Sequence, residues 1–307
     1  MFAGSASRRL GAVIADQLGV QLGASEVIRF SEGNLFVRVL QNVRGRDVFV
    51  VQGTGFPAND NFVELLFWLD AFKRSSAASV TAVIPYFSYA KGDKKDEPRV
   101  SIRGRVCADA IQAAGADRVM TLDLHAPQVQ GFFQVPTDDL YAMPLLCDAI
   151  SAMALPDVVV VAPDAGALKR ARRWAGRLDA PTAVADKRRI DHSESAEVVQ
   201  LIGSVAGRTA VIVDDFTISG GTLVAAADLL LEHGATAVYA AVTHGLLTPE
   251  SAQRLADSPI ERLLITDSIE TQPTELPDKV QVISVASLFG EAIQRIARKE
   301  SISVLFT

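Results

Sequence analysis

Short runs of Val, Ile and Ala alternate along the whole chain with longer amphipathic segments, and this alternation is the feature that most constrains the fold. Seven of the runs read as buried strands, at residues 46–54, 79–87, 117–125, 157–164, 209–216, 235–244 and 261–268. Segments of helical periodicity lie between them, at 60–75, 106–115, 167–178 and 222–234. Because strand–helix–strand units build parallel sheets, the pattern predicts an α/β fold with mainly parallel sheets flanked by helices.

The strand–helix pattern occurs twice. A Gly-Arg pair at 45–46 precedes one predicted strand, and a second pair at 207–208 precedes another, 162 residues later. The segment 118–123 matches 262–267 in its Arg and Asp, 144 residues later. Chance similarity among Val-rich strands is the alternative, and a true duplication predicts two similar domains.

The length of 307 residues suits two domains of about 150 residues each. We predict an N-terminal domain over 1–146, a C-terminal domain over 147–297 and a tail over 298–307. The first repeat is longer by the charged, irregular segment 86–105, which is typical of a functional or mobile loop.

Composition excludes several classes of protein. A net charge of −6 argues against wrapping of nucleic acid, and no apolar run approaches the roughly 20 residues that span a bilayer. Two cysteines, Cys107 and Cys147, make no disulfide framework and suit a reducing compartment. No signal-peptide core follows the first residues. We therefore expect a cytoplasmic protein without membrane or nucleic-acid partners.

The sharpest local motif is the segment 212–223, IVDDFTISGGTL. A hydrophobic run leads into Asp214 and Asp215, and a loop then leads into an amphipathic helix. Glycines let a ligand approach the backbone, and a helix N-terminus offers free N–H groups to a phosphate. Adjacent carboxylates at a strand end accept hydrogen bonds from vicinal hydroxyls or hold a divalent cation. The alternative is an ordinary turn with Thr222 as the helix N-cap.

An ordered set of motifs spans nearly the whole chain and resembles one protein family. The segment 212–223 is similar to the phosphate loop of the type I phosphoribosyltransferase fold, and the whole set resembles the ribose-phosphate pyrophosphokinase family within that fold. The matching segments are RFSEGN (29–34), NVRGRDVFVVQ (42–52), VIPYFSYAK (83–91), DLHAPQVQGFF (123–133), APDAG (162–166), DKRR (186–189), VAGRTAVIVDD (205–215) and ESIS (300–303). The resemblance implies two tandem domains of this fold. It also implies transfer of the diphosphoryl group of ATP to O1 of ribose 5-phosphate, with Mg²⁺ as cofactor.

Transfer between two polyanions requires positive charge around the transferred phosphorus. The basic run 187–189 supplies it, although a solvated turn is the commoner fate of such a run. The resemblance makes Lys187 and Arg189 the catalytic cations. It assigns ribose 5-phosphate to Asp214, Asp215, Ser219, Gly220, Gly221 and Thr222.

The resemblance places Mg²⁺ at His125 and Asp164, and a hard cation of this kind prefers oxygen ligands. A lone histidine is more often structural than a ligand, and only four histidines without paired thiols argue against zinc. Asp123, two residues before His125, is the candidate for ordering this loop.

For ATP, the resemblance implies the turn carrying Phe30, Glu32 and Asn34, the segment Lys91, Gly92, Asp93 and Lys94, and His125. The chain departs from the family pattern in several places. Asn34 stands in place of Glu, lysines replace both arginines of the second segment, and Gly92 replaces Gln. Arg103 replaces Ser or Thr, and Ile218 replaces an acid in the phosphate loop. An arginine guanidinium can contact two phosphate oxygens at once, whereas a lysine ammonium acts as a single charge. We therefore predict that this chain binds nucleotides differently from typical family members.

The family resemblance further implies a homo-oligomer, a hexamer built from dimers, in which the turn at 30–34 completes the ATP site of a neighbouring subunit. It also implies a regulatory site at Arg44, Ser301 and Ser303, where phosphate activates and ADP inhibits. The alternative is that residues 300–303 have only a structural role and pack a terminal segment.

Three other functions stay open at this point. One is a weakly active or non-catalytic paralogue that regulates a true synthetase, but a pure regulator has no need of Lys187, Arg189, His125 and Asp164. Another is the same chemistry on a changed nucleotide or sugar phosphate. A phosphoribosyltransferase is the third, against which the duplication and the basic run argue.

Overall fold

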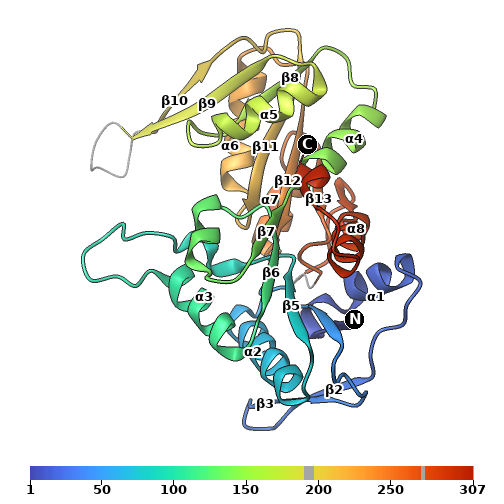
Figure 1. Cartoon of the computed structure of the whole chain (residues 1–307). Coiled ribbons are helices and arrows are strands. Elements are labelled where there is room, and N and C mark those ends of the chain that lie inside the picture. Colours follow the sequence, from blue (N-terminus) through green and yellow to red (C-terminus); the bar gives the residue numbers. More distant parts are fainter. Residues whose placement is uncertain (190–196, 271–273, 307) are drawn as a thin grey trace. The chain divides into compact units, whose positions relative to one another are not determined.

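The computed structural model describes residues 1–189, 197–270 and 274–306, and for 186–189 and 197–200 it describes the backbone alone. Contacts divide the chain into two compact units, and most of their helices and strands are labelled in Figure 1. The first unit comprises Met1–Ala142, Asp267–Thr271 and Ser284–Thr307, and the second comprises Met143–Thr266 and Gln272–Ile283.

The first unit is built on a five-stranded, wholly parallel sheet in the order β1-β4-β5-β6-β7. The strands are β1 (Phe2–Ala3), β4 (Asp47–Val51), β5 (Ser79–Ile84), β6 (Arg118–Leu122) and β7 (Thr137–Leu140). The helices are α1 (Arg8–Gln17), α2 (Ala58–Arg74), α3 (Arg103–Ala114) and α8 (Ala286–Ala297), with short 3₁₀ turns η1 (Ser5–Ser7), η2 (Ser88–Lys91), η3 (Pro127–Phe132) and η4 (Ser303–Phe306).

Both faces of this sheet are covered by helices. Val48 and Val50 belong to a core that includes Trp68 and Phe72 of α2, whose rings stack with centroids 5.5 Å apart. On the other face, Gly11 of α1 lies so close to β1 and β4 that an added Cβ would meet the Cβ of Ala3 at 2.4 Å. Strands buried on both faces explain the continuous apolar runs of the sequence.

A separate antiparallel hairpin, β2 (Ser25–Arg29) and β3 (Leu35–Val39), also belongs to the first unit. Its inward side chains Val27 and Val37 pack against the first core. The hairpin turn holds residues 30–34, with Gly33 at a φ of +89°.

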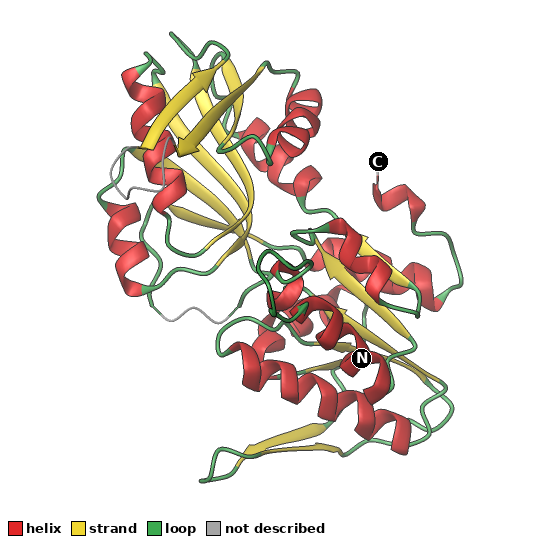
Figure 2. Ribbon diagram, turned by 90° about the vertical axis from the view of Figure 1, so that its left-hand side faces the viewer, coloured by secondary structure: helices red, strands yellow, loops and turns green. Residues whose placement is uncertain are grey.

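The second unit contains a seven-stranded sheet in the order β10-β9-β8-β11-β12-β13-β14, parallel except for β10. The strands are β8 (Val158–Ala162), β9 (Thr182–Arg189), β10 (Glu197–Ile202), β11 (Thr209–Thr217), β12 (Ala237–Gly245), β13 (Ile260–Thr266) and β14 (Val280–Ile283). The helices are α4 (Met143–Ala152), α5 (Leu168–Leu178), α6 (Gly221–Glu232) and α7 (Pro249–Ala256), and helices lie on both faces of the sheet (Figure 2).

The duplication extends to the hydrogen bonds of the turns before β4 and β11. Gly45 and Gly207 both adopt positive φ, +68° and +74°. The backbone N–H of Gly45 donates to Ser76 O at 2.8 Å, and that of Gly207 donates to Gly234 O at 2.8 Å. Glycine is required at both turns because this left-handed conformation strains other residues.

A second repeated contact follows β6 and β13. The carboxylate of Asp123 accepts a hydrogen bond from Ala142 N at 2.9 Å, just before α4. The carboxylate of Asp267 accepts one from Val285 N at 2.8 Å, just before α8. Each aspartate therefore fixes the entry into the helix that ends its repeat.

Those two terminal helices are exchanged between the units. α4 follows the first sheet in sequence but packs with α5, β12 and β14, where Leu146, Cys147 and Ile150 are buried. α8 follows the second sheet but packs against α1. The predicted boundaries at 146 and 297 follow chain order, whereas contacts place α8, with Phe289 and Ile293 buried, and the tail in the first unit. The domain division itself stays a prediction.

All seven predicted strands and all four predicted helical segments are present, and the predicted α/β class with mainly parallel sheets is confirmed. In the described parts of the chain, no helix has the length and apolar character needed to span a membrane.

Candidate active site

Strand β11 carries two carboxylates to the C-terminal edge of the second sheet. The strand lies between β8 and β12 and is fully buried up to Val213. At its end the side chains of Asp214 and Asp215 are 19% and 4% exposed. This edge is where open α/β sheets bind their ligands.

A guanidinium from α5 joins the two carboxylates. Arg170 Nη1 lies 2.7 Å from Asp214 Oδ1 and 3.2 Å from Asp215 Oδ1. Burial, followed by the hydrogen bond and the negative charge of Asp215, raises the pKa of Asp214, and the charge of Arg170 opposes the rise. Sequence reasoning missed Arg170, although it lies on the basic helix predicted at 167–178.

The loop after the carboxylates opens onto the start of α6. Ile218 and Ser219 are exposed, and Gly220 is the N-cap residue at a φ of +68°. Gly220 has no side chain with which to cap this helix, and the N–H of Gly221 lies 3.4 Å from Ser219 Oγ. As at every helix start, the first N–H groups have no partner within the helix. Arg254 Nη1 of α7, also missed from the sequence, donates to Ser219 O at 2.9 Å and fixes the loop.

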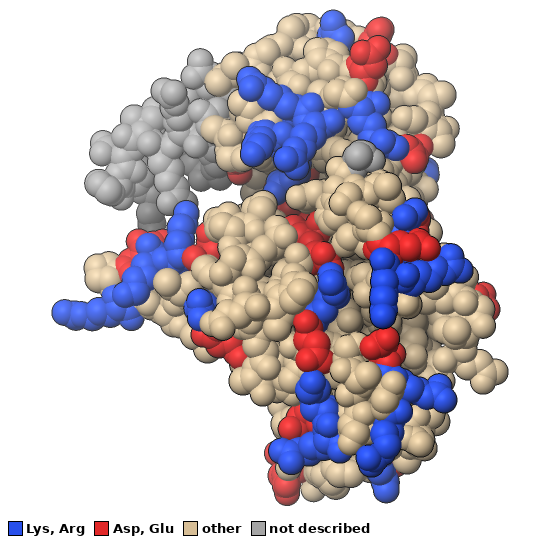
Figure 3. Space-filling model, in the orientation of Figure 1, with Lys and Arg blue, Asp and Glu red and all other residues tan. Residues whose placement is uncertain are grey.

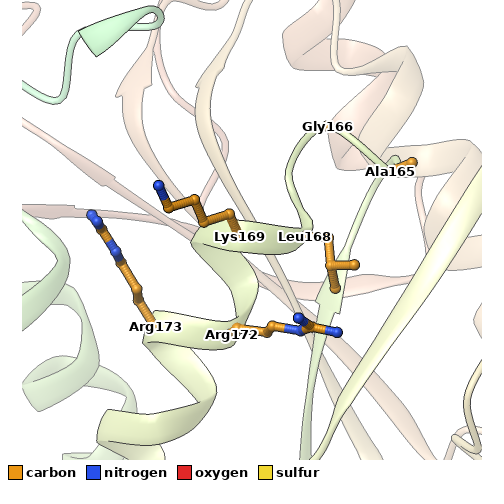
Figure 4. Close-up of a pocket in the computed structure, with 6 residues that line it drawn as sticks. All are labelled: Ala165, Gly166, Leu168, Lys169, Arg172 and Arg173. Atoms are coloured by element: carbon orange, nitrogen blue, oxygen red, sulfur yellow. The ribbon is translucent and has the colours of Figure 1, made fainter.

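Beside β11, strand β8 ends in the loop that carries Asp164. Asp164 is exposed, and its Oδ1 accepts a hydrogen bond from Ala167 N at 2.9 Å. A cavity of about 540 Å³ follows, lined by Ala165, Gly166, Leu168, Lys169, Arg172 and Arg173. Lys169 and Arg173 extend to one side of α5 and Arg172 to the other (Figure 4). Lys and Arg side chains gather over this helix (Figure 3), which makes the surface attractive to anions.

The predicted catalytic cations lie on the hairpin β9–β10. Lys187 pairs with Val199 and Arg189 with Glu197 across the two strands. The side chains of Lys187 and Arg189 lie outside the described part of the structure.

The first predicted ATP segment forms the tip of the β2–β3 hairpin. Glu32 and Asn34 are exposed, and Phe30 is 44% exposed. The ring of Phe30 lies 6.4 Å from that of Phe36, centroid to centroid. The tip therefore presents an apolar ring and two polar side chains to solvent.

The second predicted ATP segment follows η2. Lys91 is half-buried, Gly92 is buried and Lys94 is exposed. Asp93 Oδ2 accepts a hydrogen bond from Gln128 Nε2 at 2.6 Å, which ties the segment to η3. His125 is exposed in the loop after β6, just before η3.

The predicted regulatory residues are all exposed and belong to the first unit. The backbone N–H of Arg44 donates to Asn42 Oδ1 at 3.0 Å, and Ser303 N donates to Ser301 Oγ at 3.2 Å. Among the described residues no hydrogen bond or ion pair joins Arg44 to either serine.

The predicted residues thus fall into two sets. The second unit brings together Asp164, Asp214, Asp215 and the loop 218–222, whereas the predicted ATP and regulatory residues belong to the first unit. Across the described ranges, no group of three or more His, Cys, Asp or Glu side chains is arranged to hold a metal ion.

Comparison with known proteins supports one family. A model described as the N-terminal domain of ribose phosphate pyrophosphokinase matches residues 1–115, and a phosphoribosyl synthetase-associated domain matches 190–307. A ribose-phosphate pyrophosphokinase of Rhizobium meliloti (strain 1021) is 48% identical over 308 residues, covering all of this chain and 99% of the relative. One from Bacillus cereus is 44% identical over 306 residues, covering all of this chain and 96% of the relative.

A solved structure agrees with the sequence relatives. The crystal structure of phosphoribosylpyrophosphate synthetase from Mycobacterium smegmatis superposes with a TM-score of 0.90 at 37% identity, covering 97% of this chain and 98% of that one. Both the similarity of sequence over the full length and the similarity of fold lead to one conclusion: this chain belongs to the ribose-phosphate pyrophosphokinase family.

Proposed function

We propose that this chain transfers the β,γ-diphosphoryl group of ATP to O1 of ribose 5-phosphate, giving 5-phosphoribosyl 1-pyrophosphate and AMP. The observation that carries the proposal is the carboxylate pair Asp214–Asp215 on β11 and, after the short loop that follows, the start of α6 at Gly220 and Gly221. The N–H groups at the helix start can donate hydrogen bonds to a phosphate, and the carboxylates can accept hydrogen bonds from vicinal hydroxyls. One sugar phosphate satisfies both, and the family relatives support ATP as the donor.

The described residues of the second unit bind and orient the sugar phosphate. The N–H groups from Ser219 to Thr222 receive the 5-phosphate, and Arg254 holds the loop by its bond to Ser219 O. Arg170 fixes the two carboxylates side by side, so that they accept hydrogen bonds from the ribose hydroxyls. O1 is thereby presented to the donor.

In the transfer, O1 forms a bond to the β-phosphorus of ATP and releases its proton to water. The bond from that phosphorus to the α,β-bridging oxygen breaks, and AMP leaves with the electron pair. Lys187 and Arg189, carried by β9, supply positive charge where negative charge is redistributed in the transition state.

The side chains available as ligands fit a Mg²⁺ ion that is held mainly by the phosphates of the substrates. Asp164 offers a hard carboxylate oxygen at a strand end, and no dedicated cage of three ligands exists among the described residues. Asp164 and His125 are the residues that would hold the ion. When bound, Mg²⁺ neutralises phosphate charge.

We also propose a homo-oligomer, a hexamer assembled from dimers, in which the exposed tip of the β2–β3 hairpin serves a neighbouring subunit. The half-exposed ring of Phe30 supports this role. We further propose Arg44, Ser301 and Ser303 as a site for phosphate and ADP as effectors. A cytoplasmic location stays a prediction, in keeping with two free and buried cysteines.

The test is formation of the nucleoside monophosphate (AMP from ATP) by the purified protein with Mg²⁺, ribose 5-phosphate and each nucleoside triphosphate in turn. We expect AMP only when ribose 5-phosphate is present. Asp215→Asn should raise the KM for ribose 5-phosphate about tenfold, since hydrogen bonds to a carboxylate are lost. Asp228→Asn, an exposed aspartate on α6, is the matched control and should change nothing. If no triphosphate gave its monophosphate in a sugar-dependent way, the proposal would be contradicted.

A further inference from the structure

Gly92 and Arg103 are in direct contact, and the family resemblance leads one to expect a different residue at each position. Gly92 is buried, and its φ of −94° is open to any residue, so conformational freedom does not require glycine. An added Cβ at 92 would lie 2.8 Å from the Cβ of Arg103 and 2.9 Å from its Nε. Arg103 therefore occupies the space that a side chain at position 92 would fill.

The backbone fixes this arrangement. Gly104 N donates a hydrogen bond to Gly92 O at 2.9 Å. An added Cβ at Gly104 would meet Tyr89 O at 3.2 Å and Gly92 O at 3.3 Å. The first turn of α3 thus sits tightly on the end of η2, and the guanidinium of Arg103 is held beside the segment 91–94.

Arg103 is exposed and, within the described chain, its charge is not paired with a carboxylate. Arg105, two residues further along α3, has instead its Nε 2.8 Å from Asp109 Oδ1. The cationic side chains of 91–94 are lysines, which act on phosphate as point charges. A guanidinium presents a planar fork that meets two phosphate oxygens at once.

We propose that Arg103 is a nucleotide-binding residue, whose guanidinium donates to phosphate oxygens of the diphosphoryl donor beside Lys91. The absence of a side chain at Gly92 is what admits it. This rests on the proposed function and on the family resemblance, which implies nucleotide binding at 91–94. In this chain the guanidinium comes from the start of α3, and Gly92 and Arg103 act as one unit.

Binding of α,β-methylene-ATP with Mg²⁺, measured by calorimetry without sugar phosphate, tests the assignment. Arg103→Ser should weaken binding about tenfold or more, the loss expected for charge-assisted hydrogen bonds. Arg103→Lys should recover only part of it, and the KM for ribose 5-phosphate should change less than about twofold. Arg105→Ser, on the same helix, is the charge-matched control and should bind as the wild type does.

Gly92→Ala gives an independent lesion, because its Cβ displaces Arg103. It should weaken binding as Arg103→Ser does, and the double variant should be no weaker than either single variant. Unchanged binding in a folded Arg103→Ser protein, multiplicative losses in the double variant, or no binding to the wild type would each overturn the assignment. If the wild type binds the analogue through Arg103 but forms no AMP with ribose 5-phosphate, the proposed function fails and the assignment stands.

Discussion

The β4–α2 loop of the first unit and the β11–α6 loop of the second occupy equivalent places in the two repeats, but their polar side chains are used differently. Gln52 corresponds to Asp214, 162 residues later. Gln52 is fully buried, its Oε1 accepting from Ala6 N at 3.1 Å and its Nε2 donating to Asn61 O at 3.2 Å. Asp214 instead lies beside an open loop and binds Arg170.

The loops that face them differ in the same way. In the first unit, η1 closes over β4, since Ser5 N donates to Glu64 Oε1 at 2.8 Å and Gly53 N donates to Ser7 Oγ at 2.9 Å. In the second unit, the corresponding loop after β8 carries the exposed Asp164 and leads into a cavity of about 540 Å³. The same frame brings polar groups to one edge of each sheet. Whether that edge binds a ligand depends on whether the neighbouring loop already satisfies those groups.

The largest expected effect is on kcat, and it compares the hairpin β9–β10 with the hairpin β2–β3. Lys187→Ala and Arg189→Ala should each lower kcat about 10²–10³-fold, as expected when charge complementary to a transition state is lost. Thermal unfolding should shift little. Arg38→Ala on β3, whose Nη2 lies 2.6 Å from Glu26 Oε2 at the surface, is the control and should leave kcat unchanged. Near-normal turnover in both β9 variants would remove their catalytic assignment.

Substitutions in the closed loop of the first unit should lower the free energy of unfolding. Glu64 is 2% exposed and accepts hydrogen bonds from Ser5 N and from Trp68 Nε1 at 3.1 Å. Glu64→Ala leaves both donors unpaired and should cost about 2–4 kcal/mol of unfolding free energy. Glu64→Gln keeps an acceptor and should cost less. Urea unfolding measures both, and equal stability of wild type and Glu64→Ala would show that the closure is not stabilising.

An acidic side chain placed in the open loop of the second unit should increase catalytic efficiency. Ile218 is 36% exposed in this loop, and Phe56, 162 residues earlier, is its counterpart in the closed loop. Ile218→Asp should raise kcat/KM for ribose 5-phosphate about five- to a hundredfold, the scale of one hydrogen bond worth about 1–3 kcal/mol. Phe56→Asp, the matched control, should leave it unchanged. A fall in kcat/KM on Ile218→Asp would instead favour a changed sugar phosphate as substrate.

The last expected effect is spread over several pH units and concerns a carboxyl that only the first repeat has. Asp139 on β7 corresponds to Val282 on β14, since each pairs with the strand before it in the same register. Burial, and then the charge of Asp123, raises the pKa of Asp139 to about 7, while hydrogen bonds from Leu124 N and Thr121 Oγ1 oppose the rise.

Between about pH 4 and pH 7 the folded protein therefore keeps a proton at Asp139 that the unfolded chain has released. Its contribution to stability is present at low pH and is lost as the pH rises through this window. Relative to Asp139→Asn, the wild type should lose at most about 1.4 kcal/mol per pH unit. Urea unfolding at several pH values measures the difference, and parallel pH profiles would contradict it.

The sequence alone predicted the parts of this protein that depend on local pattern. Runs of Val and Ile between amphipathic segments predicted the central strands, because strands covered on both faces need apolar side chains at every position. The Gly-Arg pairs at 45–46 and 207–208 predicted a duplication, and in the structure both glycines adopt a positive φ that few other residues adopt. The motif at 212–223 predicted the carboxylate pair and the open helix start, since all its residues are contiguous.

Only the tertiary structure decided which distant residues meet. The exchange of α4 and α8, the partnership of Arg170 with Asp214 and Asp215, and the closing of the first loop by Glu64 leave no local signal. Each depends on an apolar face or a buried polar group finding its complement far away along the chain. Gly92 shows the same limit. The sequence shows only that position 92 has no side chain, whereas the structure shows that Arg103 fills the space. In a close-packed interior, such a space is filled by whichever element reaches it.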